Sequence, residues 1–157
     1  MLLRWDVAHT DRMARGLPES PFFQLLHFCD RLWFYQLQES TLTDLFCLAL
    51  IAFHEARGDG KQCQQMVAEV AINRSIDQNQ SVCAVMKQKG QFSFVGRKSL
   101  KTPTKEKESW ELSMKIAKSQ IKQKTNYTNG SKYFNAKRMG TRFGKKKKSE
   151  CGGHVFF

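Results

Sequence analysis

The sequence has no apolar run long enough for a membrane-spanning helix. The longest run, Leu45 to Phe53, has nine residues, whereas a span needs roughly 18–20. The N-terminus lacks an apolar core of signal-peptide length, because Asp6 follows soon after Met1. We therefore expect a chain that is made in a cytoplasm and carries no export signal.

Cysteine is too scarce and irregular to predict a disulfide framework. The chain has five cysteines: Cys29, Cys47, Cys63, Cys83 and Cys151. The number is odd, the spacing shows no pairs, and Cys47 and Cys63 occupy apolar positions of helical patterns. This favours small buried side chains that stay reduced. No His and Cys spacing typical of zinc occurs, so we expect neither a metal nor a cofactor.

Acidic residues are scarce in the second half of the chain. Residues 1–85 carry seven Lys/Arg against ten Asp/Glu, a net charge of −3, whereas residues 86–157 carry nineteen against four, a net charge of +15. Such asymmetry predicts a polyanionic partner, which can be a nucleic acid, a membrane surface or an anionic cell wall. The charge alone does not choose among them.

Apolar periodicity predicts a mainly α fold of the α+β type in a single domain. Helices are expected at residues 21–37, 42–56, 61–76, 82–88 and 106–122. The helix at 42–56 is apolar nearly all round, so it should lie at the centre of the core. Residues 91–105 read as an extended loop. The chain then ends in a small β-hairpin, with two short strands, in 131–139 and 154–157, joined by a basic turn.

Two of these helices show a distinct inner face. In helix 61–76 the stripe is formed by Cys63, Met66, Val67, Val70, Ala71 and Arg74. Glu69 lies off this stripe and is expected to be solvated. In helix 106–122 the expected inner residues are Trp110, Met114, Ala117 and Ile121.

The first candidate for chemistry is Glu55, in "LALIAFHEARGDG" at 48–60. The apolar helix ends there in an acid and a Gly-Asp-Gly break. A carboxyl at the end of a buried helix loses hydration, which favours its protonated form, as a general acid requires. Arg57 would oppose this effect if its side chain came close. The alternative is a helix end that simply reaches solvent.

The second candidate is "QFSFVG" at 91–96, where polar and aromatic residues alternate after Gly90. Hydroxyl and amide groups beside aromatic faces suit a sugar, whose hydroxyls need hydrogen bonds and whose ring needs a flat apolar contact. The alternative is an ordinary loop anchored by two buried phenylalanines, Phe92 and Phe94.

Five segments together resemble the family of spore-cortex-lytic enzymes and related phage cell-wall hydrolases. They are "FHEARG" at 53–58, "VAEVAINR" at 67–74, "SVCAVM" at 81–86, "QFSF" at 91–94 and "GGHVFF" at 152–157. The resemblance covers residues 41–157 and implies a lysozyme-like catalytic domain. It also implies cleavage of peptidoglycan between N-acetylmuramic acid and N-acetylglucosamine. Residues 1–40 match nothing in this family and are expected to form a helical extension.

The same resemblance implies roles for individual residues. Glu55 corresponds to the family's catalytic glutamate, and Tyr133 to Asn135 occupy the place of an aromatic and histidine segment that lines the cleft. Asn135 replaces a histidine often found there, which leaves the role of this position open. The candidate substrate-binding residues are Gln91, Phe92, Ser93, Phe94, Tyr133 and Asn135.

The resemblance favours a lytic transglycosylase that uses one carboxylate. The rival within the fold is a hydrolytic muramidase with two carboxylates, for which Asp59 and Glu69 are the nearby acids in the sequence. A basic nucleic-acid-binding module and a catalytically silent wall-binding protein are the alternatives from other classes. The run Lys145, Lys146, Lys147 and Lys148 is by default a solvated turn and, in its functional interpretation, an electrostatic anchor.

Combined with the absent signal peptide, the short chain suggests a phage endolysin or virion lysin. We expect a monomer that stays in the host cytoplasm until release, or travels with the virion. Its expected partners are the glycan strands of peptidoglycan and the anionic polymers of the cell wall.

Overall fold

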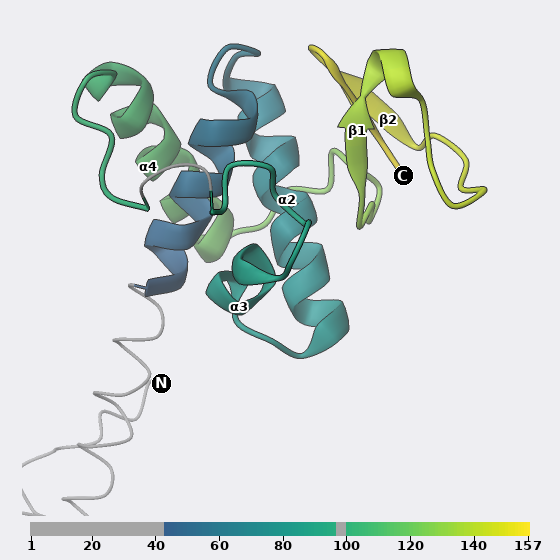
Figure 1. The fold of residues 1–157 in the computed structure, drawn as a ribbon, viewed down its shortest axis with the longest axis horizontal. Coiled ribbons are helices and arrows are strands. Elements are labelled where there is room, and N and C mark those ends of the chain that lie inside the picture. The colour runs from purple at the N-terminus through teal and green to yellow at the C-terminus, as the bar shows by residue number, and fades with distance from the viewer. Residues whose placement is uncertain (1–42, 97–99) are drawn as a thin grey trace, which may run out of the picture. The chain divides into compact units, whose positions relative to one another are not determined.

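The computed structural model describes residues 43–96 and 100–157, which belong to one compact unit, Glu39–Phe157 (Figure 1). Residues 43–56 form a helix, called here the Glu55 helix. It is followed by α2 (Lys61–Gln78), α3 (Val82–Lys87) and α4 (Lys107–Lys122). Four of the predicted helices are therefore confirmed. The predicted helix at 21–37, the boundary after residue 40 and Cys29 lie outside the described residues.

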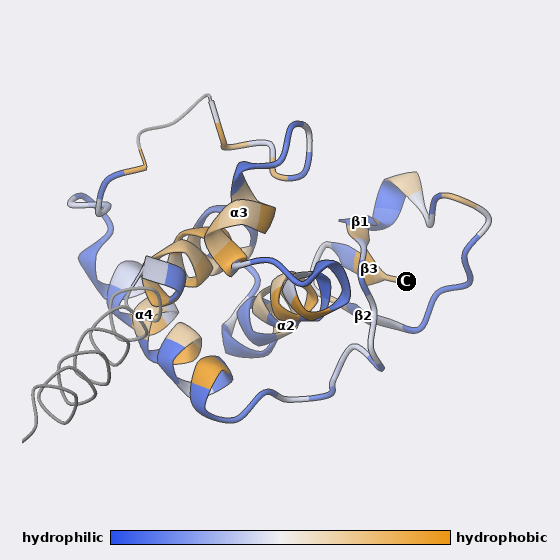
Figure 2. Ribbon diagram, turned by 90° about the horizontal axis from the view of Figure 1, so that it is seen from below, coloured by the Kyte–Doolittle hydropathy of each residue, from blue (hydrophilic) through white to orange (hydrophobic). Residues whose placement is uncertain are grey.

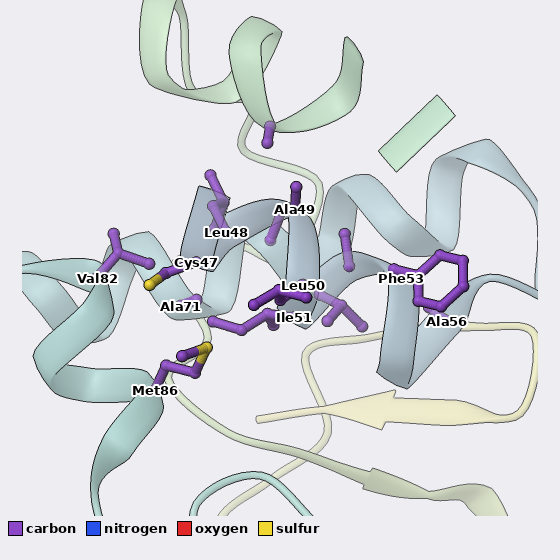
Figure 3. Packing of buried hydrophobic residues seen from close by; sticks show 14 of the residues in the cluster. Cys47, Leu48, Ala49, Leu50, Ile51, Phe53, Ala56, Ala71, Val82 and Met86 are labelled. Atoms are coloured by element: carbon purple, nitrogen blue, oxygen red, sulfur yellow. The ribbon is translucent and has the colours of Figure 1, made fainter. Parts of the chain in front are cut away.

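The Glu55 helix is the centre of the hydrophobic core, as its sequence predicts. Leu48, Ala49, Leu50, Ile51 and Ala52 are each at most 1% exposed, and Figure 3 shows this helix packed among the buried side chains of its neighbours. Burial on all sides is what an all-round apolar helix requires. In Figure 2 the hydrophobic colour lies mainly on the helices, whereas the connecting loops are mostly hydrophilic. None of the described helices has the length and hydropathy needed to cross a membrane.

Helix α2 connects the other elements, since it contacts α3, α4 and strand β2 (Ser149–Cys151). It starts after Gly60, whose φ of 85° suits glycine, and ends at Asn79 in the left-handed conformation. All six residues of the predicted stripe are buried. The prediction for this helix is thus confirmed, with two more residues at its C-terminal end.

The expectation that Glu69 is solvated is wrong, because its side chain is 0% exposed. Its Oε2 accepts hydrogen bonds from Thr125 Oγ1 at 2.7 Å and from the Tyr127 amide at 3.0 Å. Its Oε1 accepts from the Thr128 amide at 3.1 Å and from the Thr128 hydroxyl. Helical periodicity did not reveal this site, because the donors come from a loop more than fifty residues away.

The predicted inner face of α4 is partly wrong. Trp110 and Ala117 are buried and Met114 packs against the core, but Ile121 is 39% exposed. The remaining buried positions of this helix are Ser113, Ile116 and Gln120. The polar residues among them have partners: Ser113 donates to Gln64 Oε1 on α2 at 2.8 Å, and Gln120 bonds Thr125. Internal hydrogen bonds thus allow polar side chains on the buried face.

The C-terminal segment forms a three-stranded antiparallel sheet in the order β1-β3-β2, with β1 at Phe134–Ala136 and β3 at His154–Phe156. Asn135 is paired with Val155, and Glu150 of β2 is also paired with Val155. The two predicted strands correspond to β1 and β3. Strand β2 lies in the segment expected to be only a turn. The mainly α fold with a small antiparallel sheet is otherwise confirmed.

The expectation of reduced cysteines is wrong for the four that the structure describes. Cys47 of the Glu55 helix is bonded to Cys83 of α3, and Cys63 of α2 is bonded to Cys151 of β2. The partners are 36 and 88 residues apart in the sequence, so sequence spacing alone could not pair them. The first disulfide fixes the central helix, and the second fixes the sheet to the start of α2.

We expect each disulfide to stabilise the fold by about 2–5 kcal/mol, because loops of this length restrict the unfolded chain. Dithiothreitol should therefore lower the urea midpoint of the native protein. It should leave the midpoint of a variant with Cys47, Cys63, Cys83 and Cys151 all replaced by alanine unchanged. An identical midpoint for the native protein with and without reductant would contradict this role.

Candidate functional site

Glu55 lies in the last turn of the Glu55 helix, between the hydrophobic core and the surface. The residue is half-buried, and its Oε1 atom is enclosed by protein. Phe53 and Ala56 beside it are 2% and 1% exposed. The carboxyl group is therefore not on a fully solvated helix end, which was the alternative interpretation of this residue.

The loop at 91–96 lies next to this helix end. The imidazole ring of His54 stacks on the ring of Phe94, with centroids 4.5 Å apart and planes at 29°. The His54 ring also meets Phe53 edge to face at 5.1 Å. His54, the residue that precedes Glu55 in the chain, thus packs the Gln-Phe-Ser-Phe loop against the last turn of the Glu55 helix.

Within this loop, polar and aromatic side chains point in opposite directions. Gln91 and Ser93 are exposed, whereas Phe92 and Phe94 are each 3% exposed and belong to the hydrophobic core. The two rings therefore anchor the loop from inside, and they offer no open face to a sugar in this structure. This correction leaves Gln91 and Ser93 as the side chains of the loop that are available to a ligand.

Strand β1 approaches the same loop from the sheet. The rings of Phe92 and Phe134 have centroids 6.4 Å apart. Arg74 of α2 lies between the loop and the strand, with its guanidinium carbon 5.7 Å from the Phe92 ring centre and 5.6 Å from the Tyr133 ring centre. Three segments that are far apart in the sequence therefore meet around Arg74.

The structure places Tyr133 and Asn135 in different surroundings. The half-buried Tyr133 ring stacks near Phe157 at 5.9 Å and also contacts Phe143 at 5.4 Å. The side chain of Asn135 bonds local backbone: its Nδ2 donates to the Gly140 carbonyl at 3.2 Å, and its Oδ1 accepts from the Ala136 amide. Asn135 thus shapes the turn after β1, and its role in binding substrate stays a prediction.

A groove lies beside the same helix end. It is lined by Phe53, His54 and Arg57 and by residues 101–106. Arg57 Nε donates to Glu106 Oε2 at 2.7 Å, and the Arg57 guanidinium lies 4.9 Å from the Phe53 ring centre. The sequence predicts an extended loop at 91–105 and a helix that starts at Glu106, and neither prediction indicates this groove. No periodic signal marks it.

Asp59 links the helix end to the sheet. Its Oδ1 accepts a hydrogen bond from the Gly153 amide at 3.1 Å, and its Oδ2 lies 3.5 Å from His154 Nδ1. A Cβ at Gly152 would lie 2.5 Å from Asp59 Oδ1, which explains why glycine precedes this contact. Burial lowers the pKa of His154, and the charge of Asp59 opposes this effect. The Glu-Ala-Arg-Gly and Gly-Gly-His motifs therefore meet in space.

The four lysines of the basic run are exposed but differ in their contacts. Lys147 pairs with Glu150 at 3.0 Å, and this hydrogen bond together with the charge of Lys137 lowers the pKa of Glu150. Lys145 lies 5.3 Å from the Tyr133 ring centre. Lys145, Lys146 and Lys148 line a pocket together with Gly130, Lys132 and Phe157.

Comparison with known proteins adds one match. The family model described as Cell Wall Hydrolase matches residues 58–157, which is most of the chain. No curated protein and no solved structure matches. The matched range begins after Glu55, so the match itself does not cover this residue. The chain belongs to the cell wall hydrolase family and is an enzyme that acts on peptidoglycan.

Proposed function

We propose that the protein is a lytic transglycosylase that cleaves the bond between N-acetylmuramic acid and N-acetylglucosamine. Glu55 protonates the bridging oxygen, and the bond from the muramic acid C1 to that oxygen breaks. The Glu55 carboxylate then takes the proton of the muramic acid 6-hydroxyl, whose oxygen bonds to C1. The product is a 1,6-anhydro ring, and no water enters.

The observation that carries this proposal is the position of Glu55, whose Oε1 is enclosed by protein and whose helix end packs against the Gln-Phe-Ser-Phe loop through His54. A general acid must be shielded enough to hold a proton and yet reach the substrate. Gln91 and Ser93, exposed on the adjacent loop, provide hydrogen-bonding groups for sugar hydroxyls. Tyr133 supplies an aromatic group on the opposite segment.

The positions of the other acids favour a one-carboxylate route. Glu69 is buried and accepts four hydrogen bonds, and Asp59 holds the Gly153 amide. Glu69 is therefore not available to activate a water molecule, as a two-carboxylate glycosidase requires, and Asp59 is engaged by the sheet through Gly153 and His154. Glu106 is the acid that sequence reasoning overlooked, and it is held by Arg57. A hydrolytic muramidase that uses Glu106 is the alternative within this family.

The basic half of the chain fits an enzyme that works on an anionic wall. A cluster of cations raises the local concentration of the enzyme at such a surface. We propose that the protein is a phage endolysin or virion lysin that reaches the wall on release. The two disulfides support action outside the reducing cytoplasm, since such bonds persist in oxidising surroundings. Nucleic-acid binding would use the same charges but would leave the site around Glu55 without a role.

Replacing Glu55 with glutamine should lower lysis of purified peptidoglycan by roughly 10²–10⁴-fold, because general acid–base catalysis contributes about that much. Thermal unfolding should show the variant folded. Retained lysis would remove Glu55 from the mechanism. If the native protein and the variant both bind the wall but the native protein does not lyse it, the protein is instead a silent wall-binding protein.

Mass spectrometry of the released muropeptides separates the two routes. The one-carboxylate route predicts muropeptides that end in 1,6-anhydro-muramic acid. It also predicts that the Glu106→Gln variant keeps substantial lysis, because Glu106 serves only as a partner of Arg57. Reducing ends that contain an added water, together with an inactive Glu106→Gln variant, would establish the hydrolytic muramidase instead.

Lysis should decrease steeply as salt rises, because added ions screen exposed charges. Replacing Lys145, Lys146, Lys147 and Lys148 with glutamine should weaken binding to peptidoglycan several-fold and change turnover much less. The matched control removes the same charge from the exposed face of α4, at Lys107, Lys115, Lys118 and Lys122. Equal losses in the two variants at low salt would reject a dedicated anchor.

A further inference from the structure

Arg74 is a buried cation in the middle of α2. Only 5% of the residue is exposed, and burial lowers the pKa of its guanidinium. Arginine is almost never enclosed to this degree without an anionic or hydrogen-bonding partner, since removing the charge from water is costly. The arrangement therefore requires a physical explanation.

Within residues 43–96 and 100–157, the Arg74 guanidinium makes no hydrogen bond and no ion pair; its contacts are with the two ring faces. Its Nε is enclosed without an acceptor. Two more exposed cations of the chain do have partners, since Arg57 pairs with Glu106 and Lys132 pairs with Asp77. The cation–π contacts offset part of the lost hydration but leave the N–H donors unbonded.

The two rings also fix where the guanidinium lies. Phe92 belongs to the Gln-Phe-Ser-Phe loop, and Tyr133 leads into β1, so the donors lie between the two segments that flank the candidate site. Neither Nη atom is among the fully enclosed atoms that lack a partner, so the 5% of Arg74 that is exposed includes this outer edge of the guanidinium. A rigid fork of N–H donors in such a place is suited to a planar anion.

We propose that Arg74 binds a carboxylate of the peptidoglycan strand and thereby sets the strand in register with Glu55. The proposal depends on the proposed function, in which the strand passes the Gln-Phe-Ser-Phe loop. Carboxylates are carried by the peptide attached to the lactyl group of muramic acid, so one recurs beside each scissile bond. Arg74 is thus a substrate-positioning residue. The two aromatic rings hold its guanidinium flat for a bidentate contact.

The test compares two soluble disaccharide–peptide fragments of peptidoglycan, one with free carboxylates and one with its carboxylates converted to amides. The full native chain should bind the free form at least tenfold more tightly at physiological salt, the effect of one charge-assisted pair. Arg74→Gln should bind both fragments equally, at the level of the amidated one. Lys118→Gln removes the same charge from an exposed position on α4 and should keep the native preference.

A second measurement covers the case in which Arg74→Gln fails to fold. In the native chain, the side-chain ¹⁵Nε–H resonance of Arg74 should shift when the free fragment is added and stay in place with the amidated one. Equal affinity of the native chain for both fragments, or an unmoved resonance on saturation with the free fragment, would overturn the proposal. Failure of the native chain to lyse peptidoglycan would instead overturn the proposed function, so the two failures are distinguishable.

Discussion

The buried carboxylate of Glu69 is the interaction on which the site depends most. It is 0% exposed and accepts hydrogen bonds from Thr125, from the Tyr127 amide and from both donors of Thr128. Each donor belongs to the loop that runs from α4 into β1. A buried charge is tolerable only when its acceptors are satisfied in this way. The loop is consequently fixed to α2, and with it the position of Tyr133.

One turn further along α2, Asn73 also attaches the loop between α4 and β1 to this helix. Asn73 donates to the Ser131 carbonyl at 2.9 Å and accepts from Lys124 Nζ at 2.9 Å. Arg74 follows and touches the rings of Phe92 and Tyr133. The "VAEVAINR" motif therefore combines an apolar stripe that packs the core with three polar residues that arrange the site. Glu69 and Asn73 find their partners within the protein, whereas the contacts of Arg74 among the residues that the structure describes are with two aromatic rings.

Sequence reasoning succeeded where local patterns decide the structure. Apolar periodicity located the four described helices, and the all-round apolar character of residues 48–53 placed the Glu55 helix in the core. Sequence reasoning failed where groups that are distant in the sequence decide the structure. The disulfide partners of Cys63 and Cys47, the donors to Glu69 and the pairing of β2 all depend on residues brought together only by folding. Alternation in "QFSF" indicated which side chains share a direction, but it left open whether the phenylalanines face a sugar or anchor the loop from inside.

The central claim is that Glu55 donates a proton to a glycosidic oxygen of a strand held between the 91–94 loop and Tyr133. A crystal structure of the Glu55→Gln variant with a bound peptidoglycan tetrasaccharide tests it most directly. We expect the bridging oxygen of a muramic acid–glucosamine bond to lie within hydrogen-bond distance of the residue 55 amide, with Gln91 or Ser93 contacting the adjacent sugar. A tetrasaccharide bound with every glycosidic oxygen away from residue 55 would contradict it.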